Sequence, residues 1–155
     1  MEPVLTSLTL KRFRSLPSEQ VSFTNPVFLV GQNGSGKSNV VDAFAFLAEA
    51  MSSPLQAVFD RRGGISVVRN RSSGQSYPPN LGLGVTFGRI NGDMRSARYA
   101  FEIRDLPNYG FEVVREQCVI DHDTGGRDWF DRRGKKFESS GGKLDPALEA
   151  SALVL

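Results

Sequence analysis

The chain begins with short stretches whose apolar positions predict strands. Apolar and polar residues alternate over residues 4–13, a period of two that is typical of a strand with one buried face. Pro17 is expected to break this run, and residues 21–23 predict a second short strand. Residues 27–30 are apolar throughout, which favours a strand in the middle of a sheet with both faces covered. We therefore expect a sheet to begin the fold.

The period then changes to that of a helix over residues 38–51. Apolar side chains recur there at intervals of three and four, the spacing that puts them on one helical face. These positions are Val40, Val41, Phe44, Leu47, Ala48 and Met51. A second, shorter helix is predicted for residues 55–60, and residues 65–68 predict a strand after a pair of glycines.

Alternation returns in the second half of the chain, where turn residues separate several apolar runs. Residues 70–80 are rich in Ser, Gly and Pro and predict an exposed loop, and residues 81–138 predict an antiparallel β-meander that ends in a small hairpin. Residues 144–155 predict the start of a helical segment. The apolar ending at residues 152–155 indicates either a docked tail or a chain that continues in a longer protein.

Residues 31–38 read GQNGSGKS and match the pattern GxxxxGK[ST] between a predicted strand and a predicted helix. Glycines let the backbone turn tightly, so that successive N–H groups can surround a phosphate at the positive end of the helix. Lys37 would reach the β- and γ-phosphates, and the Ser38 hydroxyl would hold Mg²⁺, which prefers oxygen ligands. The pattern predicts a nucleotide and Mg²⁺ as cofactors, and we call residues 31–38 the glycine-rich loop.

Composition adds limits to this picture. A chain of 155 residues is long enough for one domain. The net charge of +2 does not by itself indicate a nucleic-acid partner, and the single cysteine, Cys118, excludes an internal disulfide and suits a reducing compartment. No apolar stretch approaches the roughly 20 residues that span a bilayer. We expect a cytoplasmic protein with no membrane partner.

Two segments resemble the nucleotide-binding head of the RecF and SMC group of ABC-type ATPases. They are LTLKRFRSL near the N-terminus and GQNGSGKSNVVDAF around the glycine-rich loop, separated by a spacing that also fits the group. The middle of the chain, LQAVFDRRGGISVVRNRSSG and the meander after it, is similar to AAA-family ATPases of this group. The resemblance implies that Arg14 approaches the nucleotide and that Asp42 lies on the helix after the loop. It implies a nucleotide site made of Arg14, Gly31, Asn33, Gly34, Ser35, Gly36, Lys37, Ser38 and Asn39.

The expected fold is the N-terminal lobe of an α/β P-loop NTPase. It would consist of a mixed sheet around the loop's helix (residues 1–69), an antiparallel β-subdomain (residues 81–138) and the beginning of a C-terminal helical segment (residues 144–155). Heads of this group also use an acidic strand end, a signature loop and a switch histidine, and no apolar run in this sequence ends in paired acids. His122 lies in a predicted turn, and Gln117 is the one residue comparable with the group's glutamine loop.

The resemblance therefore implies an ATP-binding lobe that hydrolyses little alone. The C-terminal half of the same ATPase and a second head, in a homodimer, are the implied partners, and DNA is a further candidate. Arg12 stands where the group often has Asn.

Two other functions remain open at this point. A GTPase is suggested by the two DRRG sequences at residues 60–63 and 131–134, although the sequence contains no NKxD to read guanine. A nucleic-acid or protein-binding module with structural nucleotide is suggested by a basic cluster beside aromatic residues. That cluster comprises Arg132, Arg133, Lys135 and Lys136, with Trp129, Phe130 and Phe137 as stacking surfaces.

Overall fold

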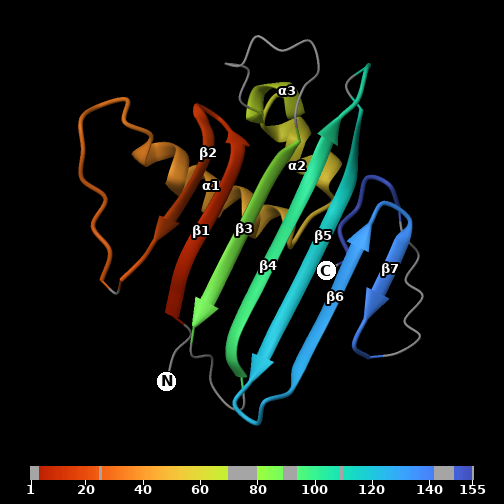
Figure 1. Ribbon diagram of the computed structural model, residues 1–155. Helices are drawn as coiled ribbons and strands as arrows, with labels where there is room; N and C mark the ends of the chain where they lie inside the picture. Colours follow the sequence, from red (N-terminus) through yellow and green to blue (C-terminus); the bar gives the residue numbers. More distant parts are fainter. Residues whose placement is uncertain are drawn as a thin grey trace.

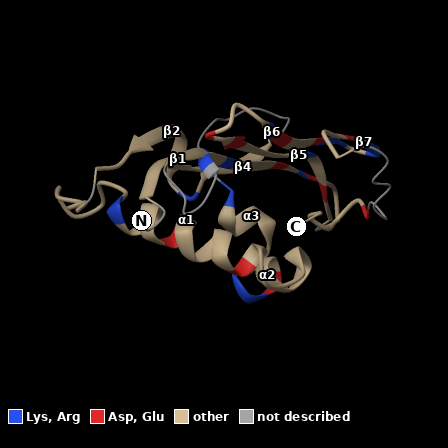
Figure 2. Cartoon of the chain, turned by 90° about the horizontal axis from the view of Figure 1, so that it is seen from below, with Lys and Arg blue, Asp and Glu red and all other residues tan. Residues whose placement is uncertain are grey.

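One antiparallel sheet and a layer of helices on one of its faces make up the structure, a computed structural model (Figure 1). Seen from below, the helices lie together under the sheet (Figure 2). The structure describes residues 4–24, 26–69, 80–88, 94–108, 110–141 and 149–154. The predicted turn at residues 91–93 and the loop at residues 70–79 lie outside the described residues.

Within the described part of the chain, the sheet has seven strands in the order β2-β1-β3-β4-β5-β6-β7, and every neighbouring pair is antiparallel. The strands are β1 (Val4–Phe13), β2 (Leu16–Ser22), β3 (Leu81–Gly88), β4 (Met94–Asp105), β5 (Phe111–His122), β6 (Arg127–Arg133) and β7 (Lys136–Ser139). The predicted meander and its final hairpin are confirmed as β3 to β7. Strand β1 pairs with β3, so both halves of the chain share one sheet.

Among the described residues, three helices cover the inner face of the sheet: α1 (Lys37–Ala50), α2 (Leu55–Arg61) and the short α3 (Ile65–Val68). Alternate residues of β1, β3, β4 and β5 are buried between the sheet and the helices, and Leu8, Leu10 and Phe101 are almost fully buried there. Aromatic rings link the layers, because Phe46 of α1 lies 5.8 Å from Phe13 of β1, centroid to centroid. Phe46 also lies 5.5 Å from the Phe59 ring of α2. Burial of these rings fixes α1 against the sheet.

The described residues near the C-terminus dock on the same face. Glu116 of β5 and Arg132 of β6 are both buried, and both contact residues 149–154. The Arg132 guanidinium donates to the carbonyls of Glu149 and Ala152, while the N–H of Val154 donates to the Glu116 carboxylate. Residues 149–154 are therefore docked on the sheet, as one of the two expectations for this end supposed. They form no helix, in contrast to the prediction for residues 144–155, of which 144–148 and 155 lie outside the described part.

The predicted mixed sheet with a separate β-subdomain is wrong in its details. The described strands form a single continuous antiparallel sheet, because β1 inserts between β2 and β3 instead of pairing within the first part of the chain alone. The element predicted as a strand at residues 65–68 is the helix α3. Its amides at Val67 and Val68 donate to the carbonyl of Gly64, which turns the chain locally instead of extending it.

Residues 27–30 do not form the predicted central strand. They carry no regular structure, and Phe28 and Val30 are 81% and 89% exposed. The segment lies outside β2, at the edge of the sheet (Figure 1). A strand needs hydrogen bonds from a neighbour, and β2 pairs only with β1 among the described residues.

Strand β2 begins earlier than predicted and includes Pro17. Proline removes one backbone N–H, which an interior strand would need for its ladder. Because β2 is an edge strand, one of its sides has no neighbouring strand that would need this donor. Pro17 therefore does not interrupt the strand.

Candidate nucleotide-binding site

The glycine-rich loop connects the exposed segment at residues 27–30 to the first turn of α1. Gly34 and Gly36 have φ angles of 83° and 93°, in the left-handed region that favours glycine. The carbonyl of Gly36 accepts from the amides of Asn39 and Val40 at 3.0 and 3.1 Å, which starts the helix. No side chain among the described residues caps α1, so its first N–H groups remain donors at the positive end of the helix.

The side chain of Lys37 folds back over the loop. Its Nζ atom donates to the carbonyls of Gly31 and Gln32, each at 2.6 Å, and lies 3.3 Å from the Ser35 hydroxyl. The ammonium group is thus held beside the concave backbone of the loop instead of extending into solvent. A positive charge beside the N-terminus of a helix is an arrangement that suits a phosphate.

The remaining polar residues of the predicted site have different surroundings. Asn33, Ser35 and Ser38 are exposed, and Ser38 presents its hydroxyl from the first turn of α1 next to Lys37. Asn39 is engaged elsewhere, because its Nδ2 atom donates to the Ser15 hydroxyl at 2.6 Å. Asn39 therefore ties α1 to the turn between β1 and β2.

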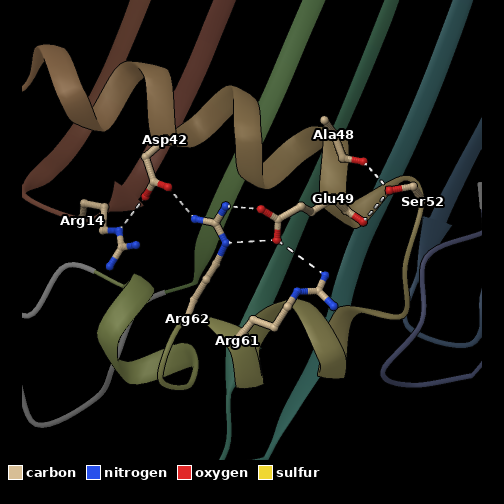
Figure 3. A network of polar contacts seen from close by, with 7 residues as sticks. All are labelled: Arg14, Asp42, Ala48, Glu49, Ser52, Arg61 and Arg62. Atoms are coloured by element: carbon tan, nitrogen blue, oxygen red, sulfur yellow. Dashed lines mark hydrogen bonds and ion pairs between the residues drawn. The ribbon is translucent and has the colours of Figure 1, made fainter.

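That β1–β2 turn also carries Arg14. The Arg14 Nε atom donates to Asp42 Oδ2 at 2.7 Å (Figure 3). The backbone N–H of Arg14 donates to the carbonyl of Val68 at 2.7 Å. The structure thus brings Arg14 to the helix that follows the loop. Arg12, four residues before Leu16, shares the positive φ angle of 53° found at Arg14.

Asp42, which lies on the helix after the loop as the resemblance implied, is the centre of a polar network that the sequence did not predict. Arg62, at the end of α2, donates to Asp42 Oδ1 at 2.5 Å and to Glu49 Oε1 at 2.7 Å (Figure 3). Arg61 adds an ion pair with Glu49 at 3.6 Å. One signal was available in the sequence, since Asp42 and Glu49 are seven residues apart and face the same side of a helix.

The electrostatics of the network follow from these contacts. Burial alone would raise the pKa of Asp42, but the hydrogen bonds and charges of Arg14 and Arg62 outweigh it, so the pKa lies below its ordinary value. The hydrogen bond from Arg62 is the main cause of the lowered pKa of Glu49. Both carboxylates are therefore ionised at neutral pH, and the network holds its charges in pairs.

The chain matches a known protein family over most of its length. A family model described as "AAA domain, putative AbiEii toxin, Type IV TA system" matches residues 27–152, a range that includes the glycine-rich loop, α1 and the meander. The chain belongs to this AAA domain family. The match confirms the predicted class, a P-loop NTPase.

Curated relatives of this AAA domain include DNA replication and repair protein RecF of Francisella tularensis subsp. novicida (strain U112) and of subsp. tularensis (strain SCHU S4). Each is 37% identical over 49 residues, which cover 31% of this chain and 14% of the relative. The match thus spans about one seventh of the length of these relatives. These findings confirm an AAA/ABC-type ATPase of the RecF/SMC-like group.

A solved structure is also similar to this AAA domain. It comes from work on ATP-driven dimerisation and DNA-stimulated activation of SMC ATPases, with a TM-score of 0.46 and 21% sequence identity. The similarity covers 84% of this chain and 70% of that chain.

Several residues singled out in the sequence lie away from the glycine-rich loop of the AAA domain. Gln117 lines a groove of about 380 Å³ on the outer face of the sheet, opposite the helices, together with Thr9, Gly82, Gly84 and Arg98. His122 ends β5, and its Nε2 atom lies 2.9 Å from Asp128 Oδ2. Among the described residues, no group of His, Cys, Asp and Glu could hold a metal ion.

The basic cluster proposed for nucleic acid is not a single surface. Arg132 is buried, with 1% of its surface exposed, and its guanidinium faces the docked residues 149–154. Phe130 and Phe137 stack on each other with centroids 5.6 Å apart. One of the four predicted basic side chains is therefore buried, and two of the three aromatic rings beside the tetrad stack on each other.

The two DRRG sequences also lie apart from the loop. Asp60 belongs to helix α2 and accepts from Gln56 at 2.8 Å, whereas Asp131 belongs to β6 and pairs with Arg115 and Arg133. No contact among the described residues links either aspartate to the glycine-rich loop. Finally, no helix among the described residues is long and apolar enough to cross a membrane.

Proposed function

We propose that this chain is the ATP-binding lobe of a RecF/SMC-like ATPase. The observation that supports the proposal most is the glycine-rich loop, in which Lys37 Nζ lies 2.6 Å from two loop carbonyls at the start of an uncapped helix. Backbone donors, a helix N-terminus and one ammonium group together suit the β- and γ-phosphates of ATP.

Mg²⁺ fits the same place through Ser38. Its hydroxyl is exposed on the first turn of α1, next to Lys37, and an alcohol oxygen is an acceptable ligand for a hard cation. Mg²⁺ in nucleotide sites is commonly held by one or two protein oxygens and by the phosphates of the nucleotide. Ser38 would therefore hold the ion jointly with ATP, and the ion would neutralise charge on the phosphate oxygens.

The wider activity is also a proposal. We infer that ATP binding promotes association with a second head, and that the C-terminal half of the same ATPase supplies the acid that positions water for hydrolysis. This chain alone would bind ATP and release little phosphate. DNA is a further proposed partner, supported by the similarity to RecF over 49 residues.

The proposal is tested by calorimetry of Mg²⁺ and ATP binding to the chain and to the Lys37→Ala variant, with phosphate release followed in the same samples. Loss of a charge-assisted contact worth about 1.5–3 kcal/mol should weaken binding about 10- to 150-fold. Lys136→Ala, an exposed lysine of β7, is the matched control and should leave affinity unchanged. Equal affinity of the parent and Lys37→Ala would reject the loop as the nucleotide site.

A further inference from the structure

The turn between β1 and β2 runs alongside the beginning of α1, with one contact for each helical turn. A Leu16 methyl lies 3.0 Å from the position a Cβ on Gly36 would take, and the Ser15 hydroxyl accepts from Asn39. Arg14 then reaches Asp42. The three helix positions are three residues apart, so they share one face of α1. This face leads from the glycine-rich loop to Asp42.

Asp42 is held from two sides. Its Oδ2 atom accepts from Arg14 Nε at 2.7 Å and its Oδ1 atom from Arg62 Nη1 at 2.5 Å (Figure 3). The Arg62 side chain is only 10% exposed, lies over the Phe46 ring with 5.3 Å between its Cζ atom and the ring centroid, and also bonds Glu49. An anchored arginine thus fixes the carboxylate that Arg14 contacts.

The bonds of Arg14 to the described residues are made mainly by its backbone and its Nε atom. Its backbone is fixed by the bond from its N–H to the Val68 carbonyl, and its Nε atom is fixed by Asp42. Its terminal nitrogens make only one contact with the described residues, a long 3.5 Å approach of Nη1 to the carbonyl of Val67. A guanidinium presents five N–H donors in a planar fork, and the terminal ones suit phosphate oxygens.

We propose that Asp42 is a positioning residue for nucleotide binding. It holds Arg14 by the Nε atom on the face of α1 that leads to the glycine-rich loop, and it leaves the terminal nitrogens for phosphate. Arg62 and Glu49 hold Asp42 in turn, so the end of α2 is coupled to the site. This inference rests on the proposed function, because it needs a nucleotide at the loop.

The direction of the change in ATP affinity distinguishes a positioning role of Asp42 from a purely electrostatic effect of its charge. Removing a carboxylate near a phosphate site favours anion binding on Coulombic grounds alone. If Asp42 acts by ordering Arg14, its removal instead weakens binding, because the arginine must then be immobilised when ATP binds. The variant Asp42→Ala is suitable because alanine is the best helix former.

The experiment is a double-mutant cycle on Mg²⁺-ATP affinity with Asp42→Ala, Arg14→Ala and the double variant. Asp42→Ala should weaken binding about 3- to 10-fold, the effect of freeing one ordered side chain. In the Arg14→Ala background the same change should have no further effect. Asp121→Ala is the matched control, since Asp121 also accepts from an arginine Nε, that of Arg127 at 2.5 Å, but near the far end of β5. Unchanged or tighter binding by Asp42→Ala would overturn the inference.

A second measurement does not depend on ATP. In ¹⁵N-arginine-labelled protein, the Arg14 Nε–H should give a slowly exchanging signal that Arg14→Ala identifies and Asp42→Ala removes. Absence of that signal from the parent, or its persistence in Asp42→Ala, would overturn the positioning role even if ATP does not bind. Failure of the parent to bind ATP with the Arg14 signal intact would instead reject the proposed function, and with it the role in nucleotide binding, while the Asp42–Arg14 contact itself would stand.

Discussion

Arg132 Nη1 lies 3.7 Å from Glu116 Oε2, and both side chains are buried between the sheet and residues 149–154. The Tyr99 hydroxyl donates to Glu116 Oε1 at 2.8 Å. Burial and the charge of Glu116 raise the pKa of Tyr99, so the phenol remains a donor. The pair is therefore a connection between β4, β5, β6 and the docked segment.

Arg132→Met should destabilise the fold strongly. It leaves the Glu116 carboxylate buried without its arginine and leaves the carbonyls of Glu149 and Ala152 without their donor. Breaking a buried pair in this way costs about 3–5 kcal/mol in the free energy of unfolding. Urea unfolding followed by circular dichroism measures the change.

The neighbouring residue provides the control for this prediction. Arg133 is exposed and pairs with Asp131 at 2.9 Å, so Arg133→Met should change the free energy of unfolding by no more than about 0.5 kcal/mol. If the two variants were equally stable, the buried cluster would not hold residues 149–154 in place.

Gly36→Ala should cost more stability than Gly34→Ala. Both positions have positive φ, which costs an L-residue about 1–2 kcal/mol. Only at Gly36 would the new Cβ also meet a side chain, Leu16 Cδ2 at 3.0 Å, whereas nothing lies within 4 Å of a Cβ at Gly34. Thermal unfolding of the two variants measures the difference, and a larger loss for Gly34→Ala would contradict the packing of the β1–β2 turn on the loop.

The sequence predicted a helix or strand correctly where the spacing of its apolar residues depended on that element alone. The helical spacing between Val40 and Met51 predicted α1 correctly, and the alternation of Leu81, Leu83 and Val85 predicted β3. The buried face of α1 differs from the predicted one, because Phe46 lies in the core, whereas Val41 and Met51 are 62% and 49% exposed. The motif gave the loop before α1. None of these predictions required knowledge of which strands pair.

Predictions failed where the outcome depended on partners far along the chain. The apolar run that ends at Val30 predicted a central strand, but no neighbouring strand is described beside it, and burial follows pairing as much as hydrophobicity. Arg132 was grouped with exposed basic residues because its partners, Glu116 and Glu149, are distant in sequence. The network around Asp42 was not predicted for the same reason, since Arg14 and Arg62 approach it from other elements.

The contribution of Asp42 to stability should depend on pH in the acid range. Its pKa is lower in the folded protein than its ordinary value of 3.8, so the unfolded state takes up the proton first as the pH falls. The stabilisation is fully present above that value and is lost as the pH falls through the folded pKa. Urea unfolding at pH 7 and at successive pH values below 4 should therefore show the parent and Asp42→Asn converging in acid. A constant difference between them would show that the carboxylate charge is not what stabilises the network.

Phe28→Ser should leave the chain's stability nearly unchanged, whereas Phe46→Ala should lower it severely. Phe28 is 81% exposed beside the glycine-rich loop, so replacing it removes few packing contacts, and surface changes usually lie within about 0.5 kcal/mol. Phe46 is fully buried between the rings of Phe13 and Phe59, where deleting a phenyl ring costs about 3–5 kcal/mol. Urea unfolding of both variants tests this contrast. A loss of more than about 2 kcal/mol in Phe28→Ser would mean that residues 27–30 pack in solution, because only buried aromatic side chains contribute that much.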